Sequence, residues 1–160
     1  MPKLIKNGIV SDDQWILIAA GESYNNDDDI LLNVADWNDD AANRSGKTGI
    51  WLDSDQAPSL IPVAVNDLPV IAINFPAFAD GRGYSYAHVL RQEMGYTGEL
   101  RAVGDVLRDQ LFFMQRCGFD AYSLRADRDA EQAIASFNDF QNSYQAAVDD
   151  STPLFQKRWG

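Results

Sequence analysis

Arginine, aspartate and glycine gather between residues 76 and 128, and their side chains and backbone are the part of this chain best suited to hold an anion. All basic residues from position 80 to position 128 are arginines. Arginine binds carboxylate, sulfate or phosphate through paired hydrogen bonds, and it also forms fixed ion pairs with acids. Acids are equally numerous in this section, so we expect ion pairs for most of the arginines. The candidate anion site consists of Asp80, Gly81, Arg82, Gly83, Tyr84, Gly104, Asp105, Arg108 and Arg125.

Two interpretations of this set of residues are open. In the functional one, Gly81 and Gly83 let a small oxyanion or a phosphate group approach the backbone closely, and helix N-termini near Tyr84 and Asp105 offer free N–H groups to it. In the structural one, the aspartates and arginines of the set form capping and ion-pair contacts that hold the loops together, because structural ion-pair networks resemble functional ones.

Other residues with reactive side chains do not form a catalytic centre in the sequence. The single histidine, His88, falls inside an expected helix, away from the loops, and the single cysteine, Cys117, is typical of a packing residue. With one residue of each kind we expect no metal site and no bound cofactor. A dinucleotide loop would need a glycine where Tyr86 stands, and a phosphate loop ending at Thr48 would need one at Ala41. No catalytic residue is assigned.

Three successive strand–helix units are predicted to position the candidate site. We expect strands at residues 70–75, 100–103 and 119–124, and helices at residues 84–94, from Asp105 to 117, and from Asp127 or Asp129 to 148. Right-handed crossovers make such strands parallel, so the loops that follow them, at 76–83, 104–105 and 125–128, converge at one edge of the sheet. Ligands bind at this edge in open parallel sheets.

The first part of the chain, residues 1–69, is typical of short strands joined by long polar loops. An apolar run covers residues 15–20, residues 30–34 suit a strand or a short helix, and residues 50–52 suit a strand. Pro62 makes the segment 60–65 an edge strand or a linker, because proline cannot donate a hydrogen bond to a sheet.

The predicted fold class is therefore α/β, with a parallel sheet that is open or forms part of a barrel. We treat residues 1–160 as one domain, with 1–69 rich in strands, 70–148 forming the strand–helix units and 149–160 a tail. A complete eight-stranded βα barrel needs about 250 residues.

Composition excludes several classes of function. The formal net charge of −11 disfavours nucleic-acid binding, which requires clustered Lys and Arg. The sequence has no long apolar run and no basic leader followed by an apolar segment, so we expect a cytoplasmic protein that does not bind membranes.

Three segments resemble an uncharacterised proteobacterial family, a domain of unknown function: residues 75–85, 95–110 and 116–120. The resemblance is strongest over residues 49–125. Genes of this family commonly neighbour the gene for the assimilatory sulfite reductase hemoprotein, and its members are often labelled oxidoreductases. The resemblance implies a place in sulfate assimilation and cysteine supply. The residues themselves give the oxidoreductase label no support.

Three hypotheses of function follow. The first is an accessory protein that docks on sulfite reductase or on its electron donor. The second is a small enzyme or sensor that binds a sulfur-pathway oxyanion or a phosphate-bearing ligand, with the arginines of the candidate site as ligands and Asp80 or Asp105 as acid or base. The third is a homo-oligomer, because Tyr84, Tyr86, Phe112 and Phe113 exceed what a small sheet covered by helices can bury.

Overall fold

The computed structural model describes residues 3–76, 81–106 and 110–123. The predicted third helix, the tail and the candidate site residues Asp80, Arg108 and Arg125 lie outside these ranges.

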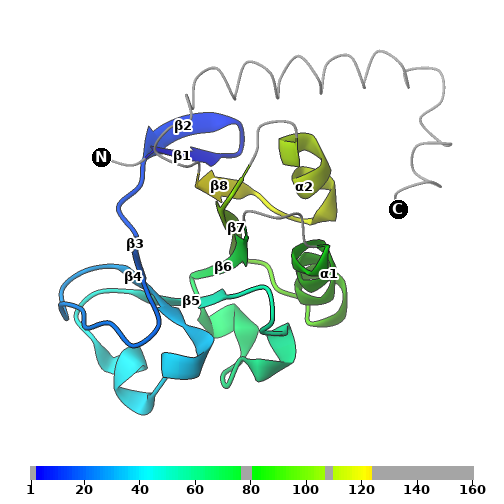
Figure 1. Ribbon diagram of the computed structural model, residues 1–160. Helices are drawn as coiled ribbons and strands as arrows, with labels where there is room; N and C mark the ends of the chain where they lie inside the picture. Colours follow the sequence, from blue (N-terminus) through cyan, green and yellow to red (C-terminus); the bar gives the residue numbers. More distant parts are fainter. Residues whose placement is uncertain (1–2, 77–80, 107–109, 124–160) are drawn as a thin grey trace, which may run out of the picture.

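The fold is α/β and is built on one open, curled sheet that forms a half-barrel (Figure 1). Its eight strands lie in the order β2-β1-β8-β7-β6-β5-β4-β3. The strands are β1 (Lys3–Lys6), β2 (Ile9–Asp12), β3 (Ile16–Ile18), β4 (Ile30–Asn33), β5 (Thr48–Leu52), β6 (Val70–Phe75), β7 (Glu99–Gly104) and β8 (Ala121–Ser123). Neighbours from β3 to β8 pair in parallel, while β1 pairs antiparallel with both β2 and β8.

In the described part of the chain, two helices cover one face of the sheet, which we call the helix face (Figure 1). They are α1 (Arg82–His88), which continues as the π-helical η5 (Val89–Glu93), and α2 (Leu111–Cys117). Strand residues alternate between the two faces, and Ile71, Ile73 and Phe75 of β6 join the core beneath the helices. Ala87 and Leu90 are the fully buried residues that α1 and η5 add to this core.

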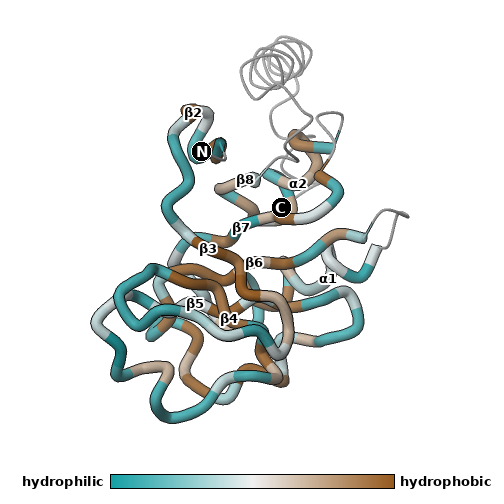
Figure 2. The backbone as a smooth tube through the Cα atoms, turned by 60° about the vertical axis from the view of Figure 1, so that its left-hand side comes forward, coloured by the Kyte–Doolittle hydropathy of each residue, from teal (hydrophilic) through white to brown (hydrophobic). Residues whose placement is uncertain are grey.

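The opposite face of the sheet has its own smaller core. Leu31, Trp51, Ala72 and Val103 are buried there, and Trp15 packs against them. Hydrophobic residues run along β3, β4 and β5, and hydrophilic loops surround them (Figure 2). Parallel strands buried on both faces require such continuous apolar runs.

The prediction of a strand at residues 70–75 is confirmed by β6, and β7 and β8 lie at the next two predicted strands. The predicted helix 84–94 corresponds to α1 and η5. The helix expected from Asp105 is described only from Leu111, since residues 107–109 lie outside the described ranges. Strand pairing in the first part of the chain extends the parallel sheet beyond the three strands predicted.

The segment with Pro62 is a linker and not an edge strand. It joins two short 3-10 turns, η3 (Pro58–Leu60) and η4 (Val65–Asp67), between β5 and β6. Two similar turns, η1 (Val34–Asp36) and η2 (Asp39–Asn43), join β4 to β5. These connections contain 3-10 turns in place of a covering α-helix.

Candidate functional site

Four polar side chains meet at the carboxyl ends of the central parallel strands, and we call them the carboxyl-edge cluster: Asn33, Asp53, Gln56 and Asn74. Asn33 ends β4, Asp53 directly follows β5, and Asn74 lies near the end of β6. In parallel sheets this edge is the usual place for ligand and catalytic groups.

Hydrogen bonds fix the geometry of this cluster. The Asn33 amide donates to Gln56 Oε1 at 2.9 Å and accepts from Gln56 Nε2 at 3.0 Å, while Asn33 Oδ1 also accepts from the N–H of Ala35. Gln56 Oε1 accepts a further hydrogen bond from the Asp53 N–H at 2.8 Å. The Gln56 side chain therefore connects the ends of β4 and β5.

Asp53 and Asn74 leave two acceptor oxygens available. Asp53 Oδ1 accepts from the N–H of Ser54 at 2.8 Å and from Asn74 Nδ2 at 3.0 Å. Within the described part of the chain, neither Asp53 Oδ2 nor Asn74 Oδ1 receives a hydrogen bond. Two open acceptors on adjacent strands suit a ligand that donates hydrogen bonds, such as an amine or a hydroxyl group.

The candidate residues Gly104 and Asp105 lie beside this cluster. Gly104 has a φ of +89°, and a Cβ atom added there would collide with Asn74 Oδ1 and with the carbonyl oxygen of Phe75. The N–H of Asp105 donates to that same carbonyl oxygen at 2.8 Å. The structure thus brings Gly104 and Asp105 next to Asn74, at the edge where the sequence predicts a site.

The residues from Gly81 to Tyr84 form the start of α1. Gly81 and Arg82 are exposed, whereas Gly83 is buried and a Cβ atom there would lie 2.6 Å from the ring of Phe75. Gly83 therefore allows the helix to pack on β6, which is the structural interpretation of this glycine. The ring centroid of Tyr84 lies 5.2 Å from that of Phe75, and burial raises the pKa of the Tyr84 hydroxyl.

The sequence analysis missed the carboxyl-edge cluster, although a signal was present. A polar residue comes directly after three apolar ones at Asn33, Asp53 and Asn74, and each of these runs is a parallel strand. The same spacing in three neighbouring strands places the polar residues at one edge.

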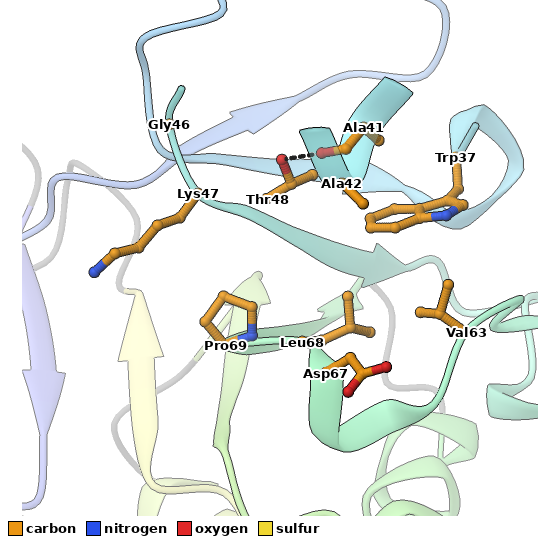
Figure 3. A pocket seen from close by; sticks show the side chains of 10 residues that line it. All are labelled: Trp37, Ala41, Ala42, Gly46, Lys47, Thr48, Val63, Asp67, Leu68 and Pro69. Carbon is orange, nitrogen blue, oxygen red and sulfur yellow. Dashed lines mark hydrogen bonds between the residues drawn. The ribbon is translucent and has the colours of Figure 1, made fainter. Parts of the chain in front are cut away.

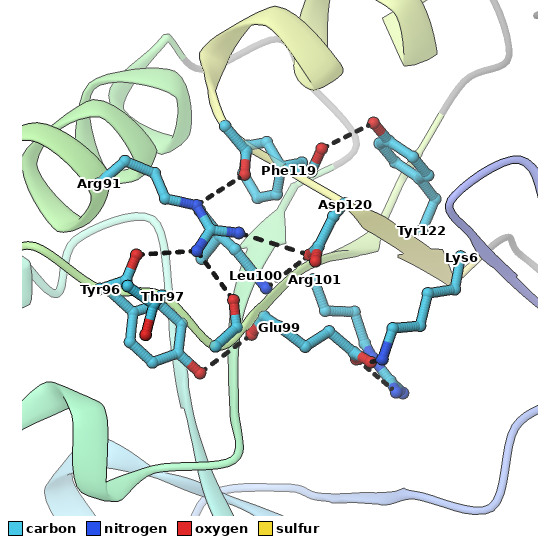
Figure 4. Close-up of polar contacts among 12 residues, drawn as sticks. Lys6, Arg91, Tyr96, Thr97, Glu99, Leu100, Arg101, Phe119, Asp120 and Tyr122 are labelled. Carbon is cyan, nitrogen blue, oxygen red and sulfur yellow. Dashed lines mark hydrogen bonds and ion pairs between the residues drawn. The ribbon is translucent and has the colours of Figure 1, made fainter.

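The predicted ion pairs of the arginines are confirmed at Arg91 and Arg101. Arg91 Nη2 lies 3.5 Å from Asp120 Oδ1, and the same guanidinium donates to the carbonyl oxygens of Tyr96, Gly98 and Gly118 (Figure 4). Burial raises the pKa of the Asp120 carboxyl, and the N–H of Leu100 and the charge of Arg91 partly oppose this shift. These contacts hold two loops together at the amino ends of the strands.

Arg101 is buried on the opposite face of the sheet, with 1% of its surface exposed. Its Nη1 lies 2.8 Å from Asp13 Oδ1, and its Nη2 lies 2.8 Å from Glu99 Oε2. Lys6 contacts the other carboxylate oxygen of Glu99 at 2.9 Å (Figure 4). The buried Arg101 therefore has two acids beside it that compensate its charge, while Lys6 pairs with Glu99 from the surface.

A cavity of about 290 Å³ lies at the other end of the strands (Figure 3). Its lining residues are Trp37, Ala41, Ala42, Gly46, Lys47, Thr48, Val63, Asp67, Leu68 and Pro69. The Thr48 hydroxyl donates to the carbonyl oxygen of Ala41 at 2.7 Å, and strand β5 begins at Thr48. This arrangement agrees with the rejection of a phosphate loop at residues 45–48, since such a loop precedes a helix.

The four aromatic residues expected to favour self-association, Tyr84, Tyr86, Phe112 and Phe113, all make contacts within the chain. The Tyr86 hydroxyl donates to the carbonyl oxygen of Ser54 at 2.8 Å, and Arg116 lies over the ring of Phe112. Phe113 stays exposed, although its ring meets that of Tyr84 edge to face. His88 ends α1 and is exposed, as predicted for a residue on a helix surface.

Over residues 3–76, 81–106 and 110–123, no three His, Cys, Asp or Glu side chains are placed to hold a metal ion. In the same ranges, no helix has the length and apolar character needed to span a membrane.

Comparison with known proteins identifies a family. No curated protein and no solved structure matches the chain. The model of the family described as "Bacterial protein of unknown function (DUF934)" matches residues 49–155, and the chain therefore belongs to this family.

Proposed function

We propose that this protein is an accessory protein of assimilatory sulfite reduction, and that it docks on sulfite reductase or on its electron donor. The placement in sulfate assimilation and cysteine supply rests on the three segments that resemble a family encoded beside the reductase hemoprotein. The structural observation that supports docking is the open sheet. It ends in two edge strands, β2 and β3, and large apolar side chains at Ile9, Ile16 and Leu17 stay exposed on them.

Exposed apolar side chains on a sheet edge are characteristic of surfaces that a partner covers. Singly placed apolar residues are common on protein surfaces, but Ile16 and Leu17 lie on opposite faces of one strand, so both faces of this edge are apolar and exposed. A docking protein needs no reaction centre of its own, which suits a chain whose sequence assigns no catalytic residue.

Direct binding of purified components tests this proposal. The protein is immobilised, and the reductase hemoprotein and its electron donor are passed over it separately, at low and at physiological ionic strength. We expect saturable binding of one of them, with serum albumin as the control analyte. Absence of binding to both at low ionic strength would overturn the proposal.

A second candidate function is favoured by the carboxyl-edge cluster, namely a small enzyme or sensor with a ligand site at that edge. The open acceptors of Asp53 and Asn74 suit hydrogen-bond donors, and an oxyanion or phosphate group would instead need Arg82 and the other predicted arginines. A ligand with both kinds of group, such as an amino acid carrying an oxyanion, would engage both sets.

Thermal stability in the presence of ligands tests this second candidate. Sulfite, sulfate, phosphate, adenosine phosphosulfates and sulfur-containing amino acids are screened for an increase in melting temperature. Arg82→Ala should abolish an increase in melting temperature that an oxyanion causes. Asn74→Ala should abolish an increase that an amine causes. Lys47→Ala is the matched control, because it removes one positive charge from the other end of the strands. Equal responses of all three variants and the wild type would exclude the site.

A further inference from the structure

Within residues 3–76, 81–106 and 110–123, the outer edge of β3 is unpaired. β3 is the last strand of the described sheet and pairs with β4, in parallel, with Ile16 opposite Ile30. The N–H of Ile16 donates to the carbonyl oxygen of Asp29 at 2.9 Å, so Ile16 directs its backbone groups toward β4. The backbone N–H and carbonyl groups of successive strand residues point to opposite sides of the strand. The N–H and the carbonyl of Leu17 therefore point away from the sheet.

This edge strand is short, with three residues, but it carries neither a charge nor a proline that would block pairing. Ile16 is 45% exposed and Leu17 is 41% exposed. No charged residue or proline occurs from position 14 to position 21, whereas charged side chains and proline normally block the pairing of edges. At the other edge of the sheet, β2 carries such a charge, because Asp12 forms a 2.7 Å ion pair with Lys3.

Exposed acidic residues lie in the loop that follows β3. Glu22 lies in the turn directly after the strand, and its N–H donates to the carbonyl oxygen of Ala19. Asp27 is exposed in the loop that returns to β4, whereas the Asp29 carboxylate accepts a hydrogen bond from the Lys47 N–H at 2.9 Å, on the inner side of the strand. A neutral apolar strand followed by exposed acids attracts a segment of the complementary kind, with apolar side chains and Lys or Arg next to them.

We propose that the outer edge of β3 accepts an extended segment of a partner protein, with apolar side chains and Lys or Arg next to them, which adds a strand to the sheet. In this binding mode main-chain hydrogen bonds provide affinity and alternate side chains provide specificity. The inference rests on the proposed docking function and specifies its surface. A second copy of this chain is the weaker occupant, because it would place the same acids against each other in a protein of net charge −11.

Hydrogen exchange and two matched variants test this inference, with the reductase hemoprotein and its electron donor as probes. In the free protein the Leu17 amide should exchange rapidly, and the bound probe should slow its exchange. Leu17→Lys should weaken binding by about tenfold or more, because the new ammonium repels a basic segment and the charge blocks edge pairing. Leu60→Lys is the control, since Leu60 is 56% exposed but lies in η3, away from the edge.

The outcomes separate the two proposals. If neither probe binds the wild type, docking on these proteins is wrong, and the β3 inference is overturned with it. If a probe binds, leaves Leu17 exchange unchanged and binds Leu17→Lys as well as the wild type, the edge inference is wrong while docking stands. If the free protein is a dimer by sedimentation and Leu17→Lys makes it monomeric, the occupant is a second copy, and the partner segment is excluded.

Discussion

Arg101 and Asp13 form an ion pair inside the protein, with Arg101 Nη1 2.8 Å from Asp13 Oδ1. The two residues come from β7 and from the connection between β2 and β3, so the pair joins the N-terminal segment to the middle of the sheet. Glu99 and Lys6 complete the group. In this group of alternating charges Arg101, Asp13 and Glu99 are buried, so they fix how the segments are arranged and depend on one another.

Asp13→Ala should lower the free energy of unfolding by about 3 kcal/mol, because it removes one of the two acids that compensate the buried Arg101. Urea titration measures this change. Lys3→Ala is the comparison, since it removes an exposed ion pair with Asp12 and should have a much smaller effect. An equally small effect of Asp13→Ala would mean that Glu99 alone satisfies Arg101.

Gly104→Ala should destabilise the fold by about 1–3 kcal/mol, because the left-handed backbone conformation is unfavourable for alanine and the new methyl group displaces Asn74. Gly81→Ala is the matched control, since its φ is −71° and nothing lies within contact distance of the added carbon. Thermal unfolding compares the two variants. If both unfold at the same temperature, Asn74 is not held against Gly104.

The Asp120 carboxyl should make stability fall as pH rises. Burial raises its pKa in the folded state above the ordinary value of 3.8, so the folded state binds the proton more tightly than the unfolded state does. The free energy of unfolding contributed by this group is therefore highest at acid pH, and it decreases as pH rises from 3.8 through the raised pKa. The difference between the wild type and Asp120→Asn, measured by urea unfolding across this range, isolates the contribution.

Asp12 provides the comparison of opposite sign. Its hydrogen bond and ion pair with Lys3 lower its pKa, so its contribution is present above 3.8 and is lost as pH falls through the lowered pKa. The wild type should therefore lose stability relative to Asp12→Asn on acidification. If the contributions of Asp120 and Asp12 to the free energy of unfolding change in the same direction with pH, one of the two pKa directions is wrong.

Cys117 should react slowly with alkylating and disulfide reagents in the folded protein. Burial raises the pKa of its thiol, and the neighbouring Arg116 only partly opposes this shift, so little thiolate forms at neutral pH. The rate of reaction with a chromogenic disulfide reagent should increase several-fold in denaturing urea. Rapid reaction of the native protein would instead indicate an activated thiol.

The elements that local pattern controls were predictable from the sequence. Strand β6 lies between Pro69 and Pro76 and is apolar except for Asn74, and its predicted bounds agree with the structure. The helix of α1 and η5 followed from apolar residues at helical spacing and from a terminating Gly95, which has a φ of +68°. Both features depend on residues that are close together in the chain.

Features that depend on distant residues were not predictable in this way. The contact of Asn74 with Asp53 requires the register of β6 against β5, and Gln56 reaches Asn33 only because the β5 to η3 turn folds back. The burial of Arg101 depends on Asp13, which no short-range pattern connects to it. Arginine composition predicted ion pairs but could not separate buried arginines from those near the carboxyl edge.

The position of β1 between β2 and β8 also has a consequence for how the protein is made. The hairpin of β1 and β2 leaves the ribosome well before β8, the second neighbour of β1, because β8 includes residues 121–123. During translation, Ile5 therefore has no partner on its β8 side until Tyr122, which lies opposite it in the β1–β8 register, has been synthesised. Pairing between such distant segments slows folding, and the half-finished sheet displays an open strand to other chains in the cell.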